Sequence, residues 1–163
     1  MSESKQCLLM LLILLSPFTY AKSPVFGDYP VKADQPYENK SLFLNGKAKS
    51  YMTLFKDLNK QKTNFAGHYV LETFGCGGGC QSIAVINRAT GRGFLHPHDF
   101  SDCYHEKYGY IGRDLEFKAN SRLLILTGRR GADISQCERV YYLVEANHFK
   151  TLKQEWLYPT KSK

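Results

Sequence analysis

The sequence lacks a complete catalytic signature and has no apolar run long enough to cross a membrane. Its longest apolar stretch extends from Cys7 to Leu15, whereas a membrane-spanning helix needs about 20 apolar residues. The glycine-rich stretch GCGGGCQS is not followed by Lys-Ser or Lys-Thr, and a cysteine stands where a dinucleotide-binding loop has its third glycine. We therefore expect neither a phosphate-binding loop nor a membrane span.

Acidic residues are also in short supply. Lys and Arg together number 22 against 15 Asp and Glu, which gives a formal net charge of +7 at pH 7. A basic protein outside the cytoplasm meets anionic envelope polymers or acidic proteins more often than nucleic acid. The expected partner is therefore an envelope protein or an anionic envelope polymer, with no nucleic acid and no cofactor.

Residues 1–21 have the layout of a secretory signal peptide. One lysine near the front is followed by the apolar run, a proline at Pro17, and Thr-Tyr-Ala before the next charged residue. We expect cleavage after Ala21 and a periplasmic or secreted product.

The remaining chain fits one domain. Residues 22–40 contain three prolines and little periodicity, which predicts an extended Pro-rich arm. Residues 41–158 are predicted to form a single disulfide-braced β-rich domain, and residues 159–163 a basic tail.

The fold class predicted is α+β and mainly β. The stretch KAKSYMTLFKDLNKQ places Tyr51, Met52, Phe55 and Leu58 on one face at helical spacing. From Asn64 onward, short β-rich runs are separated by the turn-like stretches RATGR, KANS and EANH. This pattern predicts an antiparallel meander of about six to eight strands, with one N-terminal amphipathic helix packed on it. A small barrel, a sandwich and a propeller-like arrangement all fit the pattern.

Cysteine number indicates disulfides. Without the signal peptide four cysteines remain, and an even number in an exported chain predicts two disulfides with three possible pairings. We favour Cys76 with Cys80 and Cys103 with Cys137, because neighbours along the chain pair first. A crossed pairing, Cys76 with Cys103 and Cys80 with Cys137, stays open.

A thiol-dependent enzyme or redox protein is one alternative. Cys76 or Cys80 would then be the nucleophile, His68 the base, and the amides of residues 77–79 an oxyanion site. A disulfide in an oxidising compartment would remove the nucleophile, so we lean against catalysis.

A metal-binding protein is a second alternative. The stretch HPHDFSDCYH gathers imidazoles and a thiol of the kind that bind zinc or copper. The candidate ligands are His96, His98, Cys103 and His105, with Asp99 and Asp102 nearby. Against this, the spacing matches no standard zinc finger, and an extended His-Pro-His segment points its two rings to different sides.

Candidate binding residues lie beside the glycine turn and at one basic loop. His68, Tyr69 and Gln81 flank the turn, and Arg129 and Arg130 form a loop tip between glycines. Loops on rigid scaffolds are where binding residues concentrate.

One long stretch carries a family resemblance. The sequence NFAGHYVLETFGCGGGCQSIAVINRATGRGF, followed by NSRLLILTG and YYLVEANHF, resembles a family of small exported bacterial proteins. In that family a helix leads into an Asn-Phe-Ala-Gly-His-Tyr segment and then a Gly-Cys-Gly-x-x-Cys-Gln turn. The match covers roughly residues 47 to 150, and it implies export and a shared fold without supplying a reaction.

These observations together predict an exported, non-enzymatic binding module of the cell envelope. Its size, compartment and charge make an inhibitor or immunity protein against a cell-wall-active enzyme the concrete form of that prediction.

Overall fold

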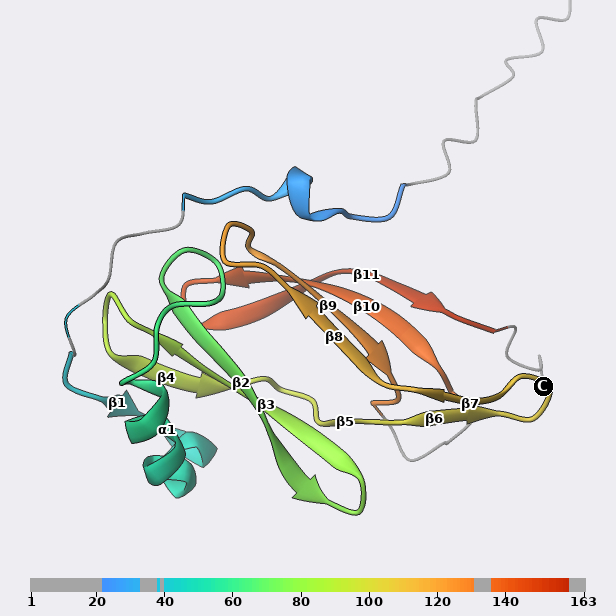
Figure 1. The fold of residues 1–163 in the computed structure, drawn as a ribbon, viewed down its shortest axis with the longest axis horizontal. Coiled ribbons are helices and arrows are strands. Elements are labelled where there is room, and N and C mark those ends of the chain that lie inside the picture. The colour runs from blue at the N-terminus through green and yellow to red at the C-terminus, as the bar shows by residue number, and fades with distance from the viewer. Residues whose placement is uncertain (1–21, 33–37, 39, 131–135, 159–163) are drawn as a thin grey trace, which may run out of the picture.

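A computed structural model describes residues 22–32, 38, 40–130 and 136–158 of the chain. The predicted signal peptide and the basic tail lie outside the described residues, as do residues 33–37 and 39 of the arm. The described residues form a mainly-β α+β fold with three largely antiparallel sheets, which confirms the predicted class (Figure 1). None of their helices is both long and apolar enough to span a bilayer.

The first sheet has the strand order β1-β4-β3-β2, and β5 also pairs with β3. Its strands are β1 (Phe43–Leu44), β2 (Tyr69–Gly77), β3 (Cys80–Asn87), β4 (Arg92–Leu95) and β5 (Phe100–Ser101). The second sheet has the order β11-β10-β9-β8, and β6 and β7 form a separate two-stranded ribbon. These strands are β6 (Cys103–His105), β7 (Gly109–Gly112), β8 (Asp114–Phe117), β9 (Leu123–Gly128), β10 (Glu138–Glu145) and β11 (His148–Trp156).

The two larger sheets pack against each other around one hydrophobic core. Side chains from both sheets share this core, among them Leu71, Ile83, Val85, Leu124, Leu126 and Val140. Neither sheet closes on itself within the described residues. Of the architectures that the sequence left open, the arrangement is thus an open sandwich rather than a closed barrel.

The helix covers the outer face of the first sheet. A 3₁₀ segment, η2 (Gly46–Tyr51), leads directly into α1 (Met52–Leu58). Phe55 and Leu58 are fully buried and pack with Val70 and Ile86 of the sheet. Strand β3 is therefore buried on both faces, which explains why its sequence SIAVIN is apolar without alternation.

The predicted apolar face of the helix was wrong at Met52, which is 41% exposed. A 3₁₀ segment has three residues per turn instead of 3.6, so it shifts the phase of the side chains that follow. Leu54 packs against the helix side of the core instead.

The strand count and one pairing also differ from the prediction. The described residues contain eleven strands rather than six to eight, in part because the stretch read as a histidine-rich loop contains β5 and β6, and β7 follows it. Strand β1 runs parallel to β4, with Phe43 opposite Arg92, whereas a meander has only antiparallel pairs.

The first described part of the arm, residues 22–32, lies on the second sheet. Residues 22–32 include a short 3₁₀ turn, η1 (Phe26–Asp28), and run above β8 and β9 in Figure 1. The Val31 amide donates to the Asn120 carbonyl at 3.0 Å, and the Ser121 hydroxyl donates to the Phe26 carbonyl at 2.9 Å. These bonds fix the arm against the turn between β8 and β9.

Gly93 sets how closely the helix approaches the sheet, which gives a first prediction. A Cβ atom at this position would lie 2.5 Å from Leu44 and 2.6 Å from Phe55. Gly93→Ala should therefore lower the free energy of unfolding by about 1–3 kcal/mol through overpacking. Urea unfolding of the oxidised protein measures this, with Gly27→Ala as the control because a Cβ there meets nothing within 4 Å. Equal unfolding midpoints for the two variants would contradict the packing argument.

Candidate functional site

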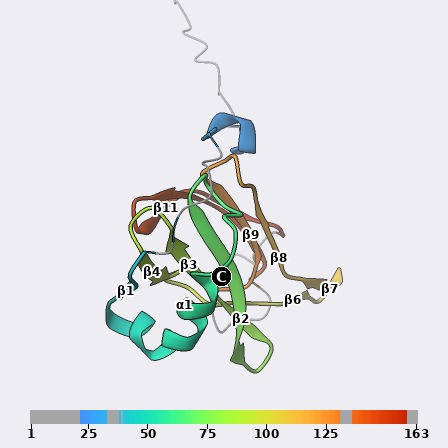
Figure 2. The same ribbon diagram turned by 60° about the vertical axis from the view of Figure 1, so that its left-hand side comes forward.

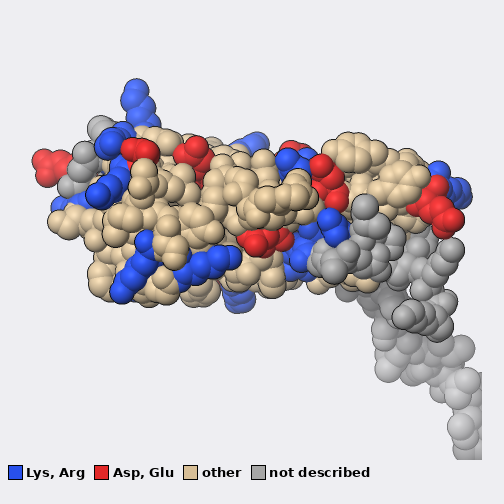
Figure 3. Space-filling view, turned by 90° about the horizontal axis from the view of Figure 1, so that it is seen from below, with Lys and Arg blue, Asp and Glu red and all other residues tan. Residues whose placement is uncertain are grey.

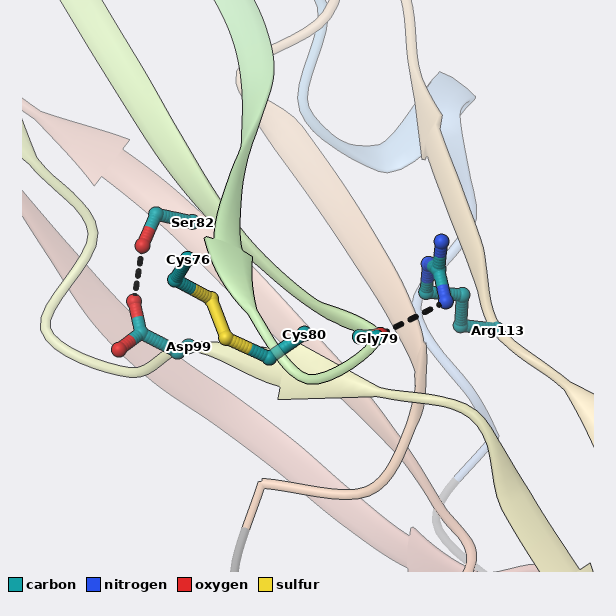
Figure 4. Close-up of a disulfide and its surroundings, with 6 residues drawn as sticks. All are labelled: Cys76, Gly79, Cys80, Ser82, Asp99 and Arg113. Carbon is teal, nitrogen blue, oxygen red and sulfur yellow. Dashed lines mark hydrogen bonds between the residues drawn. A yellow bond between two sulfur atoms is a disulfide. The ribbon is translucent and has the colours of Figure 1, made fainter.

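The glycine stretch forms the tip of the β2–β3 hairpin and is closed by its own two cysteines. A disulfide joins Cys76 to Cys80, with the two Cα atoms 5.3 Å apart (Figure 4). Gly77, Gly78 and Gly79 have φ values of 91°, 55° and 78°, a region that residues with a side chain rarely adopt. The three glycines thus allow the tight reversal, and the disulfide holds it.

Two side-chain contacts tie this tip to its neighbours (Figure 4). The Arg113 guanidinium donates to the Gly79 carbonyl at 3.0 Å and forms an ion pair with Asp102 at 2.9 Å. The Ser82 hydroxyl donates to the Asp99 carboxylate. Since Asp102 immediately precedes β6 and Arg113 follows β7, the glycine tip is connected to the base of the β6–β7 ribbon.

The structure does not bring together the residues of the thiol-enzyme alternative. Cys76 and Cys80 are bonded to each other, so neither is a free thiolate. His68 precedes the first residue of β2, whereas Cys76 lies near the end of that strand. Eight extended residues separate them by roughly 25 Å, and the His68 ring packs against Tyr69 at a centroid distance of 4.4 Å.

The predicted binding residues do not share one surface. Tyr69 is buried in the core, and its hydroxyl donates to the Ala146 carbonyl at 2.6 Å. Burial raises the pKa of Tyr69 above its ordinary value. Gln81 lies within the sheet, where it pairs with Phe100 of β5, far along the hairpin from His68.

Arg130 is a structural residue rather than a solvated loop tip. Its guanidinium donates twice to the Glu138 carboxylate, once at 2.9 Å, and also to the Tyr142 hydroxyl at 2.8 Å. Gln154 donates to the same carboxylate at 2.6 Å. The side chains of Arg130 and Glu138 are only 16% and 4% exposed. This network links the end of β9 to β10 and β11, and the bond to Glu138 is the main reason that the pKa of Arg130 is raised.

His96 is a core residue. Its ring lies 4.6 Å from the Tyr142 ring and 4.9 Å from the Phe149 ring, measured between centroids. Nδ1 lies 2.9 Å from the His98 carbonyl oxygen, while Nε2 is buried without a hydrogen-bond partner. Burial lowers the pKa of His96 to about 4, because the protonated ring would bury a charge and an unsatisfied N–H group.

The proposed metal ligands are used for other contacts. Cys103 forms a disulfide with Cys137, with Cα atoms 5.5 Å apart, so the structure has the pairing favoured from the sequence. His96 points into the core, and the His105 ring packs against Tyr108 at a centroid distance of 4.9 Å. Within the described ranges, no three His, Cys, Asp or Glu side chains converge in a way that would hold a metal ion.

The most exposed aromatic group of the described residues lies on the β6–β7 ribbon, residues 103–112, which we call the tyrosine hairpin. Tyr104, Tyr108 and Tyr110 are 47%, 51% and 70% exposed. The hairpin extends from one end of the molecule in both ribbon views (Figures 1 and 2). In Figure 3 this end is on the right, where uncharged surface is bordered by charged side chains at the tip.

The tyrosine hairpin is held firmly at its base. The disulfide fixes Cys103 to Cys137, and Asp102 binds both Arg113 and the Tyr110 hydroxyl, a hydrogen bond that raises the pKa of Tyr110. Tyr108 stacks on Tyr158 with centroids 4.6 Å apart. The aromatic side chains are therefore presented in defined positions.

The sequence did not lead to a prediction of this hairpin, because the histidines of the same stretch favoured a loop. The signal was present in the alternation of Tyr108, Gly109 and Tyr110, since Gly109 has a φ of 76° and closes the ribbon. Two short strand-like runs separated by three to five residues that include a glycine form a hairpin pattern.

The two disulfides should differ in accessibility and in stabilisation. Cys76 is exposed, whereas Cys103 and Cys137 are buried. The two disulfides join cysteines that are 4 and 34 residues apart in the sequence. In the chain-entropy description they stabilise the folded protein by about 2 and about 4 kcal/mol, respectively. Mild reduction followed by alkylation and mass spectrometry should label Cys76 and Cys80 first in a protein that stays folded. Earlier labelling of Cys103 would overturn this order.

Stability should fall in acid because of His96. Its pKa is about 4 in the folded protein and about 6.5 in an unfolded chain. Between these two pH values the unfolded chain therefore binds a proton that the folded protein excludes. The contribution of the neutral His96 ring to the free energy of unfolding is complete above pH 6.5 and is lost as the pH falls towards 4. Urea unfolding should give a free energy about 2 kcal/mol lower at pH 4.5 than at pH 7 from this residue alone.

His96→Phe should remove that part of the pH dependence, and His98→Phe, at an exposed position, should keep it. Parallel stability profiles for the wild type and His96→Phe would contradict the assignment.

The two disulfides suggest an oxidising location outside the cytoplasm. No protein-family model matches the chain, and no curated protein and no solved structure gives a significant match.

Proposed function

We propose that the protein is an exported, non-enzymatic binding module of the cell envelope that recognises a partner protein through the tyrosine hairpin. The observation that carries the proposal is the exposure of Tyr104, Tyr108 and Tyr110 on a ribbon braced by Cys103–Cys137. Large aromatic side chains that are exposed to solvent together at one end of a protein mark interaction sites.

Tyrosine is well suited to this role. Its ring buries a large apolar area, its hydroxyl keeps a polar contact, and few rotatable bonds must be ordered on binding. Tyrosine is also enriched among the residues that contribute most to protein interfaces. A hairpin fixed before binding loses less conformational entropy when it docks, and both the disulfide and the Asp102 contacts supply that preorganisation.

The shape of the hairpin supports a concave partner. A narrow ribbon that extends from a rigid sandwich (Figure 2) can enter a cleft that a flat surface cannot contact. The active site of an enzyme often lies in a cleft of this kind. The concrete form of the proposal is therefore an inhibitor or immunity protein against a cell-wall-active enzyme in the periplasm or outside the cell.

Retention of envelope proteins on the immobilised full chain tests the proposal. The wild type should retain an envelope protein, and the triple variant Tyr104→Ser, Tyr108→Ser, Tyr110→Ser should retain at least tenfold less, because hot-spot truncations cost about 2 kcal/mol or more. Quantitative mass spectrometry of the eluates measures the difference. An inhibition assay with purified wall-cleaving enzymes then tests the concrete form, with loss of inhibition expected in the same variant.

Phe43→Ser is the matched control, since Phe43 is 52% exposed and lies on β1, away from the hairpin. Both variants should unfold at the temperature of the wild type. Equal retention by the wild type and the triple variant would overturn the proposal. Retention that survives the tyrosine changes and disappears in high salt would instead indicate an anionic polymer bound through lysines.

A further inference from the structure

We propose that the outer backbone edge of β2 at residues 73–75 binds an extended peptide segment of a partner protein by strand addition. We call this stretch the open β2 edge. The inference goes beyond the tyrosine hairpin and does not depend on it.

Strand β2 is the last strand of its sheet, so one of its edges faces away from β3. At Leu71 that edge is covered by a side chain, because Asn64 accepts from the Leu71 amide at 2.8 Å and donates to the Leu71 carbonyl at 2.9 Å. Alternate residues of an antiparallel strand direct their backbone groups to the same side. Thr73 and Gly75 therefore point their N–H and C=O groups outward, as Leu71 does.

These outward groups have no partner in the part of the chain that the structure describes. Apart from its pairing with β3, no hydrogen bond to a backbone group of Thr73 or Gly75 occurs among the described residues. Unpaired edges of this kind are templates for pairing with another chain.

The two edges of the second sheet are protected in the usual ways. Strand β11 carries Lys150 and Lys153, and β8 is four residues long and begins at Asp114. Charged side chains and short strands both discourage pairing with foreign strands. The open β2 edge, with the sequence Thr-Phe-Gly, has neither a charge nor a proline.

Gly75 supports a close approach by another backbone. Its φ lies outside the left-handed region, and a Cβ atom there would meet nothing within 4 Å. The fold therefore does not require glycine at this position, although glycine weakens a strand by about 0.5–1 kcal/mol relative to alanine. A glycine inside a strand often marks a place where a ligand or another backbone comes close.

The geometry favours a flexible segment over a second copy of this chain. Asn64 covers the edge before Thr73, and a bulge between Gly75 and Gly77 interrupts it afterwards. Two copies of β2 would thus pair over only three residues, too little for a stable dimer. An extended segment from a partner can pair with these residues and then follow the surrounding surface.

Selection from a display library of ten-residue linear peptides tests the inference with the full oxidised chain. Peptides should be enriched by the wild type. Their affinity should fall at least tenfold in Thr73→Pro, which removes one outward N–H group without touching the pairing to β3. Hydrogen exchange at the Thr73 and Gly75 amides should slow when peptide is bound.

Thr73→Val is the matched control, because it changes the same side chain but keeps the outward N–H group. This control and the triple tyrosine variant should bind the peptides as the wild type does, which separates this inference from the proposed function. Failure to enrich any peptide, or equal binding by Thr73→Pro, would overturn it. Concentration-dependent dimerisation that Thr73→Pro abolishes would also overturn it, in favour of a second copy.

Discussion

The burial of β3 on both faces is the constraint on which the rest of the structure depends. Ile83 and Val85 face the second sheet, whereas Ala84 and Ile86 face the helix. Two layers therefore pack on one strand, and each buried side chain contributes about 1.5–3 kcal/mol of hydrophobic stabilisation. Because this packing fixes the second half of β3, the β2–β3 hairpin has a rigid stem from which its tip extends.

Much of the fold was predictable because it follows from local pattern. The turns at RATGR, KANS and EANH lie between the strands expected there. Turns are predictable because they depend on the conformational preferences of glycine, asparagine and their immediate neighbours. The phase of Met52 and the parallel pairing of β1 were not predictable, because they depend on a 3₁₀ turn and on a partner about 50 residues away. Hydrophobic periodicity reports neither.

Side-chain roles were harder to predict than strands. Arg130 reads as a solvated loop residue until the fold brings Glu138 and Tyr142 to it, and His96 reads as a metal ligand until burial against Phe149 makes the neutral ring the stable form. In both cases the deciding contact comes from a different strand. The glycine hairpin was the exception, because its two cysteines lie only four residues apart and their pairing is a local event.

The tyrosine hairpin and the open β2 edge have one physical property in common. A rigid support allows groups that favour aggregation to remain exposed at the surface. An unpaired strand edge invites misfolding or aggregation when the chain around it fluctuates, and exposed tyrosines carry the same hazard. Here each is anchored by a disulfide, Cys76–Cys80 beside the open β2 edge and Cys103–Cys137 below the tyrosine hairpin. Arg113 connects the two anchors through Gly79 and Asp102, so a partner that contacts one feature meets the other in a fixed relative position.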